Sequence, residues 1–197
     1  MTLRPILALL TAATLAGCGI NSVPTAQETA AARWADVQVN YQRRADLIPN
    51  LVETVRGFAA QERNVLTEVT EARSRASSIQ LNADQLDDPQ AVAQFQAAQG
   101  ALSTSLGRLL ATVESYPELR SNQNFLALQS QLEGTENRIA ISLRDYNEAV
   151  RDYNTRIRTF PEMIGAKLIH GAKPMTPFEA KAGADVAPDV GTMFNGN

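Results

Sequence analysis

Polar side chains that could carry chemistry cluster around Pro49, in the stretch YQRRADLIPN. The cluster holds two arginines, an aspartate and an asparagine, namely Arg43, Arg44, Asp46 and Asn50. The guanidinium groups could bind an anion or a partner protein, and the backbone carbonyl that proline leaves without its helical donor could accept a hydrogen bond from that partner. The alternative is that these residues cap and solvate a distorted turn, with Asp46 paired to an arginine. We favour the second interpretation.

A repeated tyrosine-asparagine pair is the second candidate. In YNEAVRDYN, Tyr146 and Asn147 are followed seven residues later by Tyr153 and Asn154. Seven residues make two helical turns, so both pairs lie on one face. That face could form a ligand groove or contact a partner. Alternatively, the tyrosines belong to the core and their hydroxyls reach the edge of the helix bundle, which is the commoner arrangement.

The remaining composition excludes most reactions. His170 is the only histidine, so the sequence cannot supply the paired Glu-x-x-His motifs of a di-iron bundle or a Ser-His-Asp triad in the main helices. A zinc ligand set and a glycine-rich phosphate loop are also missing. We therefore expect no metal, no cofactor and no enzymatic activity.

The N-terminus has the order of an export signal. A charged start, MTLRP, precedes the short apolar run ILALLTAAT and then LAGC, which ends at Cys18. LAGC resembles the bacterial lipobox, in which cleavage before the cysteine is accompanied by lipidation of its thiol. An ordinary signal or a short anchor is the alternative. Because Cys18 is the only cysteine, we predict a lipoprotein signal peptide over residues 1–17, a lipid on Cys18 and a tether over residues 18–24.

The net charge of −3 argues against nucleic acid as a partner and against membrane binding by charge alone. Attachment to a membrane must therefore come from the lipid. Gly19 stands where an aspartate typically retains such lipoproteins at the inner membrane. In a host with two membranes we expect the outer one, with the protein facing the periplasm.

Apolar residues recur every three or four positions from Trp34 to Ile79, which indicates one long helix with one buried face. Thr25 and Glu28 have the spacing of a capping box. We therefore predict that this first helix begins at Thr25 and runs to about Gln80.

Pro49 lies inside this predicted helix. The apolar register passes through it without a shift, and Ile48 would be a poor cap for a helix that restarted there. We favour a kinked, continuous helix, although a full break stays open. Glu62 occupies a core position of the register, and we expect it to pair with an arginine of another helix, because burying it unpaired would be costly.

A first helix of this length would reach roughly 80 Å, against roughly 54 Å for the third helix. Its end nearest the membrane carries the apolar residues Trp34, Val37 and Tyr41. We expect the C-terminal segment or another copy of the protein to cover this stripe, because an exposed stripe of that size would be an interaction surface.

Further helices follow. A second begins at Pro89 with Asp88 as its cap, a third runs from about Asn122 to Arg158, and a short fourth comes after Pro161. The predicted fold is all-α, an antiparallel up-and-down helical bundle with a long, kinked first helix.

Glycine and proline recur after the last helix. We predict that the bundle domain covers residues 25–170 and that residues 171–197 form a loosely structured tail.

Several stretches resemble the LemA family: RRADLIPNLVETVRGFAAQE, TEARSRA, YPELRSNQNFLALQSQLEGTENRIA, YNEAVRDYN and FPEMI, with weaker matches in PFEA and PDV. The resemblance implies an up-and-down helical bundle, usually anchored to a membrane of the bacterial envelope, with no assigned reaction. The sequence departs from the family in two places. LAGC replaces the usual transmembrane helix, and HGAKPM replaces a glycine-phenylalanine turn.

These observations favour a non-catalytic lipoprotein of the cell envelope, a helical scaffold that binds or positions another envelope protein. The partner is not identifiable from the sequence, and a second copy of the chain is a further candidate. The alternative is an accessory subunit that modulates an envelope peptidase or a cell-wall enzyme. The two differ in whether the catalytic rate of a partner changes on binding.

Overall fold

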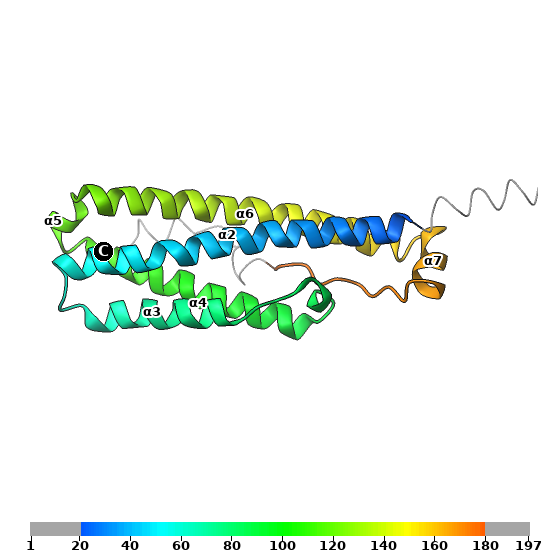
Figure 1. Cartoon of the computed structure of the whole chain (residues 1–197), viewed down its shortest axis with the longest axis horizontal. Coiled ribbons are helices and arrows are strands. Elements are labelled where there is room, and N and C mark those ends of the chain that lie inside the picture. Colours follow the sequence, from blue (N-terminus) through cyan, green and yellow to red (C-terminus); the bar gives the residue numbers. More distant parts are fainter. Residues whose placement is uncertain (1–20, 180–197) are drawn as a thin grey trace, which may run out of the picture.

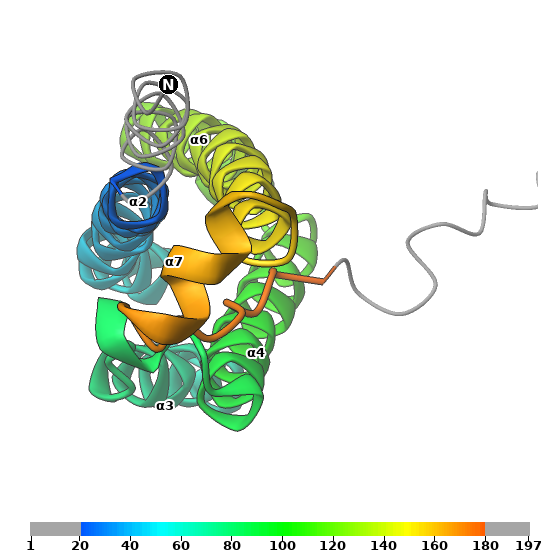
Figure 2. The same cartoon turned by 90° about the vertical axis from the view of Figure 1, so that its right-hand side faces the viewer.

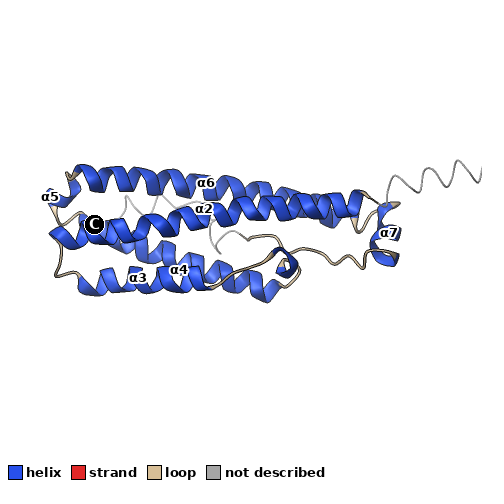
Figure 3. Cartoon of the chain, in the orientation of Figure 1, coloured by secondary structure: helices blue, strands red, loops and turns tan. Residues whose placement is uncertain are grey.

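The computed structural model describes residues 21–179 (Figure 1). Four long helices lie side by side: α2 (Ser22–Phe58), α3 (Arg63–Ser78), α4 (Pro89–Val113) and α6 (Gln123–Arg156). The chain direction alternates from each of these helices to the next (Figure 1). Helices make up 79% of the described residues, which contain no strand (Figure 3). The predicted all-α antiparallel bundle is confirmed.

Three short elements join the long helices. A 3-10 turn (Ala83–Gln85) lies between α3 and α4, and α5 (Pro117–Arg120) lies in the connection from α4 to α6. After α6 the chain forms α7 (Glu162–Leu168) across one end of the bundle (Figure 2). The short helix predicted after Pro161 is thus confirmed.

Side-chain caps explain where two of the long helices begin. The Asp88 carboxylate accepts hydrogen bonds from the backbone N–H groups of Gln90 and Ala91 at the start of α4. The Asn122 side chain likewise accepts from Asn124 and Phe125 at the start of α6. Each cap satisfies donors that have no partner within their own helix. Both predicted start sites are confirmed.

The start of α2 differs from its prediction. The helix begins at Ser22, and the hydroxyl of Thr25 donates to the carbonyl of Asn21. The predicted capping box at Thr25 and Glu28 is therefore wrong, and the tether predicted over residues 18–24 is too long. Val23 is fully buried, so burial of its apolar side chain favours the additional helical turn. The predicted signal peptide and Cys18 lie outside the described residues.

The prediction of one helix from Thr25 to Gln80 is also wrong. α2 ends at Phe58, and Ala59 has non-helical dihedral angles (φ −130°, ψ 50°). The chain then turns back on itself as α3. The apolar register could not reveal this break, because both arms of a tight helical hairpin face the same core. The apolar register continues in α3 through the buried residues Leu66, Val69, Ala72 and Ala76.

α2 passes through Pro49 without a break, as the sequence favoured. Because proline has no N–H, the carbonyl of Ala45 lacks its helical donor. The Nε atom of Arg73 in α3 donates to this carbonyl at 2.7 Å. The proline therefore creates an acceptor on α2 that an arginine of the neighbouring helix satisfies.

The segment after α7 differs from the loosely structured tail predicted from residue 171. Residues 172–179, which we call the strap, form neither helix nor strand, yet Met175 and Phe178 are each only 7% exposed. They pack into the core cluster formed by α2, α4 and α6 at that end of the bundle. Residues 180–197 lie outside the described part of the chain.

The bond between Arg73 and Ala45 gives a first prediction. Arg73→Ala should lower the free energy of unfolding by about 1–3 kcal/mol, because it leaves a partly buried carbonyl without a donor. In a Pro49→Ala background the same change should cost much less, since the new N–H at position 49 can bond to Ala45. Urea unfolding followed by circular dichroism measures both values.

Arg75→Ala is the control for this experiment, because Arg75 and its partner Glu71 are both about 60% exposed. Such a surface ion pair contributes at most about 1 kcal/mol. An equal cost of Arg73→Ala in both backgrounds would contradict the role assigned to Pro49.

Candidate functional site between α4 and α6

α4 and α6 border a groove whose floor is α2. The groove contains a cavity of about 610 Å³, and the strap enters between the same two helices from the α7 end (Figure 2). The walls of the cavity are formed mainly by Gln96, Gly100 and Ser103 of α4 and by Glu136, Ala140 and Leu143 of α6. We call this feature the α4–α6 groove.

The first tyrosine-asparagine pair along the path of the strap is Tyr153 with Asn154. The hydroxyl of Tyr153 donates to the carbonyl of Lys173 at 3.0 Å. The Asn154 side chain makes two bonds to the backbone of Met175: its Nδ2 donates to the carbonyl at 2.8 Å, and its Oδ1 accepts from the N–H at 2.9 Å. One residue of the strap is thus held through both of its backbone groups.

The second pair, two helical turns back, repeats this arrangement. The hydroxyl of Tyr146 donates to the carbonyl of Thr176 at 3.0 Å. The Asn147 amide donates to the carbonyl of Phe178 and accepts from its N–H, each at 2.8 Å. The predicted face of Tyr146, Asn147, Tyr153 and Asn154 therefore exists, and its occupant is the chain's own strap.

The two repeats match in length. Seven helical residues advance by about 10.5 Å, and three residues of an extended, proline-rich segment advance by about 9 Å. The strap reads KPM-TPF over residues 173–178. Pro174 and Pro177, which have no N–H to donate, stand at positions where the tyrosine-asparagine pairs supply no acceptor. This spacing lets α6 hold the strap mostly through its backbone.

Aromatic packing fixes the end of the strap. The Phe178 ring stacks on Trp34 at 5.3 Å between centroids and meets the edges of Phe95 and Tyr146 at 6.1 and 5.7 Å. Trp34 is 1% exposed, and its Nε1 donates to the carbonyl of Leu81 at 2.6 Å. Aromatic contacts of this kind contribute beyond their buried area.

Two residues of the predicted stripe, Trp34 and Val37, are therefore covered, whereas Tyr41 is half-buried and lines two cavities. Of the two covers expected for the stripe, the structure has the C-terminal segment of the same chain: Trp34 packs against Phe178, and Val37 is fully buried in the same cluster. The excess length that motivated the expectation does not exist, because α2 stops at Phe58.

Burial also sets the ionisation of the tyrosines. It raises the pKa of Tyr146 and of Tyr153, and for Tyr153 the nearby charge of Asp87 adds to the effect. Burial raises the pKa of Tyr41 to about 12. All three hydroxyls therefore stay protonated at neutral pH, as the donated hydrogen bonds of Tyr146 and Tyr153 require.

Arg44 forms the floor of the groove beyond the strap. Its side chain is buried, and its guanidinium lies 5.0 Å from the ring centre of Tyr41, within range of a cation–π contact. Nη1 donates to Ser103 and to the Glu136 carboxylate at 2.9 Å each, and Nη2 donates to Gln99 at 2.6 Å. An arginine of α2 thus bridges α4 and α6.

The polar cluster predicted around Pro49 does not form one site. Arg44 points into the bundle, whereas Arg43 and Asp46 line a separate surface cavity. Asp46 accepts a hydrogen bond from Gln42 at 2.7 Å, so its predicted pairing with an arginine is wrong. Helical geometry explains the separation, since neighbouring residues point about 100° apart while Arg43, Asp46 and Asn50 share a face.

Glu62 also has a different partner from the predicted arginine. The hydroxyl of Tyr116 donates to its carboxylate at 2.7 Å and accepts from Gln61 at 2.9 Å. The bond to Glu62 raises the pKa of Tyr116. This contact joins the turn between α2 and α3 to the turn between α4 and α5.

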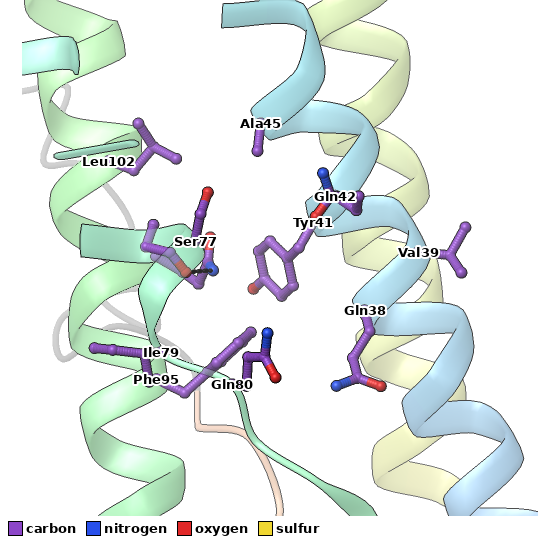
Figure 4. A pocket seen from close by; sticks show the side chains of 12 residues that line it. Gln38, Val39, Tyr41, Gln42, Ala45, Ser77, Ile79, Gln80, Phe95 and Leu102 are labelled. Atoms are coloured by element: carbon purple, nitrogen blue, oxygen red, sulfur yellow. Dashed lines mark hydrogen bonds between the residues drawn. The ribbon is translucent and has the colours of Figure 1, made fainter. Parts of the chain in front are cut away.

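A second cavity, of about 290 Å³, lies between α2 and the end of α3. Figure 4 shows Tyr41 projecting from α2 into it, with Gln38 and Gln42 on the same helix and Ser77 and Gln80 opposite. Tyr41 lines both this cavity and the α4–α6 groove. The residues around the second cavity are neutral amides, hydroxyls and apolar groups, a lining that offers no general acid or base of ordinary pKa.

Sequence reasoning missed the residues that complete the site. Gln99 is buried in α4 between Phe95 and Leu102. A polar residue at this helical spacing among apolar ones is a signal in the sequence that could have identified it. Arg44 stands out in the sequence as part of the polar cluster around Pro49, but its partners lie 55 to 92 residues away. Nothing local in the sequence pairs them.

Comparison with known proteins gives one family match and three relatives. The model of the LemA family matches residues 33–191. Magnetosome protein MamQ of Magnetospirillum gryphiswaldense is 29% identical over 181 residues, and Magnetosome protein MamQ 1 of Paramagnetospirillum magneticum is 28% identical over the same length; each match covers 84% of this chain and 66% of the relative. Protein LemA of Metamycoplasma hominis is 24% identical over 124 residues, 63% of this chain and 52% of that protein. The chain thus spans about two-thirds of the length of the MamQ proteins.

The bonds between α6 and the strap give a second prediction. Asn147→Ala removes both hydrogen bonds to Phe178 and should cost about 1–3 kcal/mol of unfolding free energy. Amide hydrogen exchange of residues 173–178, followed by mass spectrometry, should become faster while α3 stays protected.

Asn137→Ala, at an exposed position of the same helix, is the matched control and should leave the strap unchanged. Unaltered protection of the strap in Asn147→Ala would show that aromatic packing alone holds it.

Proposed function

The chain belongs to the LemA family, and we propose that it is a non-catalytic, lipid-anchored protein of the cell envelope. In this role it holds an extended segment of another envelope protein in the α4–α6 groove. The observation that carries the proposal is the strap. It demonstrates how α6 grips an extended chain through its backbone, and the cavity bordered by Phe178 and Glu179 continues the same path towards Arg44.

The anchor is proposed from the sequence. Residues 21–179 include no helix that is long and apolar enough to cross a membrane. LAGC and the single cysteine favour a lipid on Cys18. Family membership and the similarity to MamQ support association with a membrane. In a host with two membranes, the residue after Cys18 favours the outer one.

The chemistry of the groove suggests what it would accept. Its polar walls offer the amide of Gln96, whose buried Nε2 has no hydrogen-bond partner, and the half-exposed carboxylate of Glu136. Ile139 and Leu143 offer apolar contact beside them. An extended peptide presents backbone donors and acceptors at regular intervals, together with side chains that can occupy the apolar part. A small substrate would need converging catalytic groups, which this lining does not provide.

Site-specific photo-crosslinking in intact cells tests the proposal and is our third prediction. A photoreactive phenylalanine analogue at Ala140, an exposed position in the groove wall, should form an adduct with one envelope protein. Mass spectrometry should map the adduct to one extended segment of that protein. Ala97→Trp, which fills the facing wall, should reduce the yield several-fold.

The control places the same analogue at Ala127, which is exposed on another face of α6. Equal yields at both positions, or no effect of Ala97→Trp, would contradict the groove as the binding site. An adduct at twice the mass of the chain would replace the proposed partner by a second copy.

A further inference from the structure

A patch of exposed apolar side chains marks the α7 end of the bundle. Phe160 is 76% exposed, Leu168 82%, Ile169 60% and Ile164 49%. The three most exposed large apolar residues of the described chain are therefore within ten residues of one another. We call these four residues the α7 foot.

The orientation of α7 is the reverse of what a surface helix of a soluble domain normally shows. Its small residues Gly165 and Ala166 are buried against the bundle, while Ile164 and Leu168 face outward. Surface helices usually turn their large apolar residues to the core. Contiguous exposed apolar patches mark sites that contact a protein or a membrane.

The foot lies at the end of the bundle where α2 begins. Figures 1 and 2 both place α7 beside the first turn of α2. Val23 of α2 and Ala166 of α7 belong to the same buried cluster. The start of the first helix and the apolar foot therefore share one end of the molecule.

The tether length places this end near the membrane, given the proposed lipid on Cys18, on which this inference rests. Three residues lie between Cys18 and Ser22, and the four steps from Cys18 to Ser22 span at most about 14 Å when the chain is fully extended. A side chain that penetrates the interface of a bilayer does so by about 5–10 Å. The foot is therefore within reach of the leaflet that would hold the lipid.

We propose that the α7 foot inserts into the interfacial layer of this leaflet, so that the bundle stands on the membrane at its α7 end. The charges beside the foot suit this contact. Arg158 and Lys167 are exposed, whereas the one carboxylate on α7, Glu162, is half-buried. Exposed cations next to inserted apolar groups favour a surface of anionic lipids. The groove would then point away from the membrane along the bundle.

An environment-sensitive label tests the foot. The protein used begins at Gly19, so it keeps every described helix and lacks the native cysteine, Cys18. In this chain, Leu168→Cys is labelled with a nitrobenzoxadiazole dye. A histidine tag at its N-terminus holds it on vesicles of phosphatidylcholine and phosphatidylglycerol that contain a nickel-chelating lipid. We expect blue-shifted emission and quenching by nitroxides on the acyl chains. Leu126→Cys, 48% exposed beyond the first turn of α6 at the other end of the bundle, should show neither.

A double variant separates the possible outcomes. Phe160→Ser with Ile169→Ser changes only exposed side chains and should reverse most of the shift at position 168. If the dye at position 168 showed the emission of a water-exposed group while the protein was on the vesicles, the proposed insertion of the foot would be wrong. A shift that depends on protein concentration and is not quenched from the lipid would also overturn it, because a second copy would then cover the patch.

The anchor is tested separately, so that its failure is distinguishable. The full chain, expressed in a bacterial host, should stay in the membrane fraction after a carbonate wash, and Cys18→Ala should not be processed or retained. Retention of normally processed Cys18→Ala would contradict the anchor but not the foot, which the tethered chain tests without acylation.

Discussion

The buried guanidinium of Arg44 is the constraint on which the bundle depends. A charge inside a helical bundle must find hydrogen-bond acceptors, because an unpaired buried charge costs several kcal/mol. Arg44 finds them in Gln99, Ser103 and Glu136, which line two helices rather than one. The network therefore keeps polar side chains between α4 and α6, where apolar residues would otherwise close the gap. We infer that this arginine keeps the groove open, because it is hydrogen-bonded to both walls.

The two ends of the bundle then acquire different characters. Towards α5, apolar residues of α2, α3, α4, α5 and α6 fill the core. Towards α7, an irregular segment completes the core, because Phe178 packs its ring against those of Trp34, Phe95 and Tyr146. The tyrosine-asparagine pairs of α6 hold this segment through its backbone, so the same helix face that closes one half of the groove could grip an extended partner in the other. A foot on the membrane would orient the open half outward.

The sequence predicted those parts of the structure that depend on local chemistry. Asp88 and Asn122 indicate helix starts in the sequence, because a cap and the N–H groups it accepts from are neighbours in the chain. The apolar register likewise indicates that α2 continues through Pro49. The turn after Phe58 was not predicted, because the apolar register continues across a helical hairpin. The ordered strap was not predicted for a different reason. Its prolines and glycines suggest a loose segment, whereas its order comes from Asn147 and Asn154, which are 31 and 21 residues away. Contacts between segments that are far apart in the chain do not appear in the hydrophobic periodicity of the sequence.

The distance between α4 and α6 tests the central claim most directly. Spin labels at Ala101 and Ile141, both exposed, report this distance by electron paramagnetic resonance in the chain from Gly19 onward. We predict one narrow distance distribution. Arg44→Met should shorten and broaden it, because the walls lose their polar bridge. Arg43→Met, a surface change at the next residue, should leave it unchanged. An unaltered narrow distribution in Arg44→Met, with the helices still folded, would contradict the account.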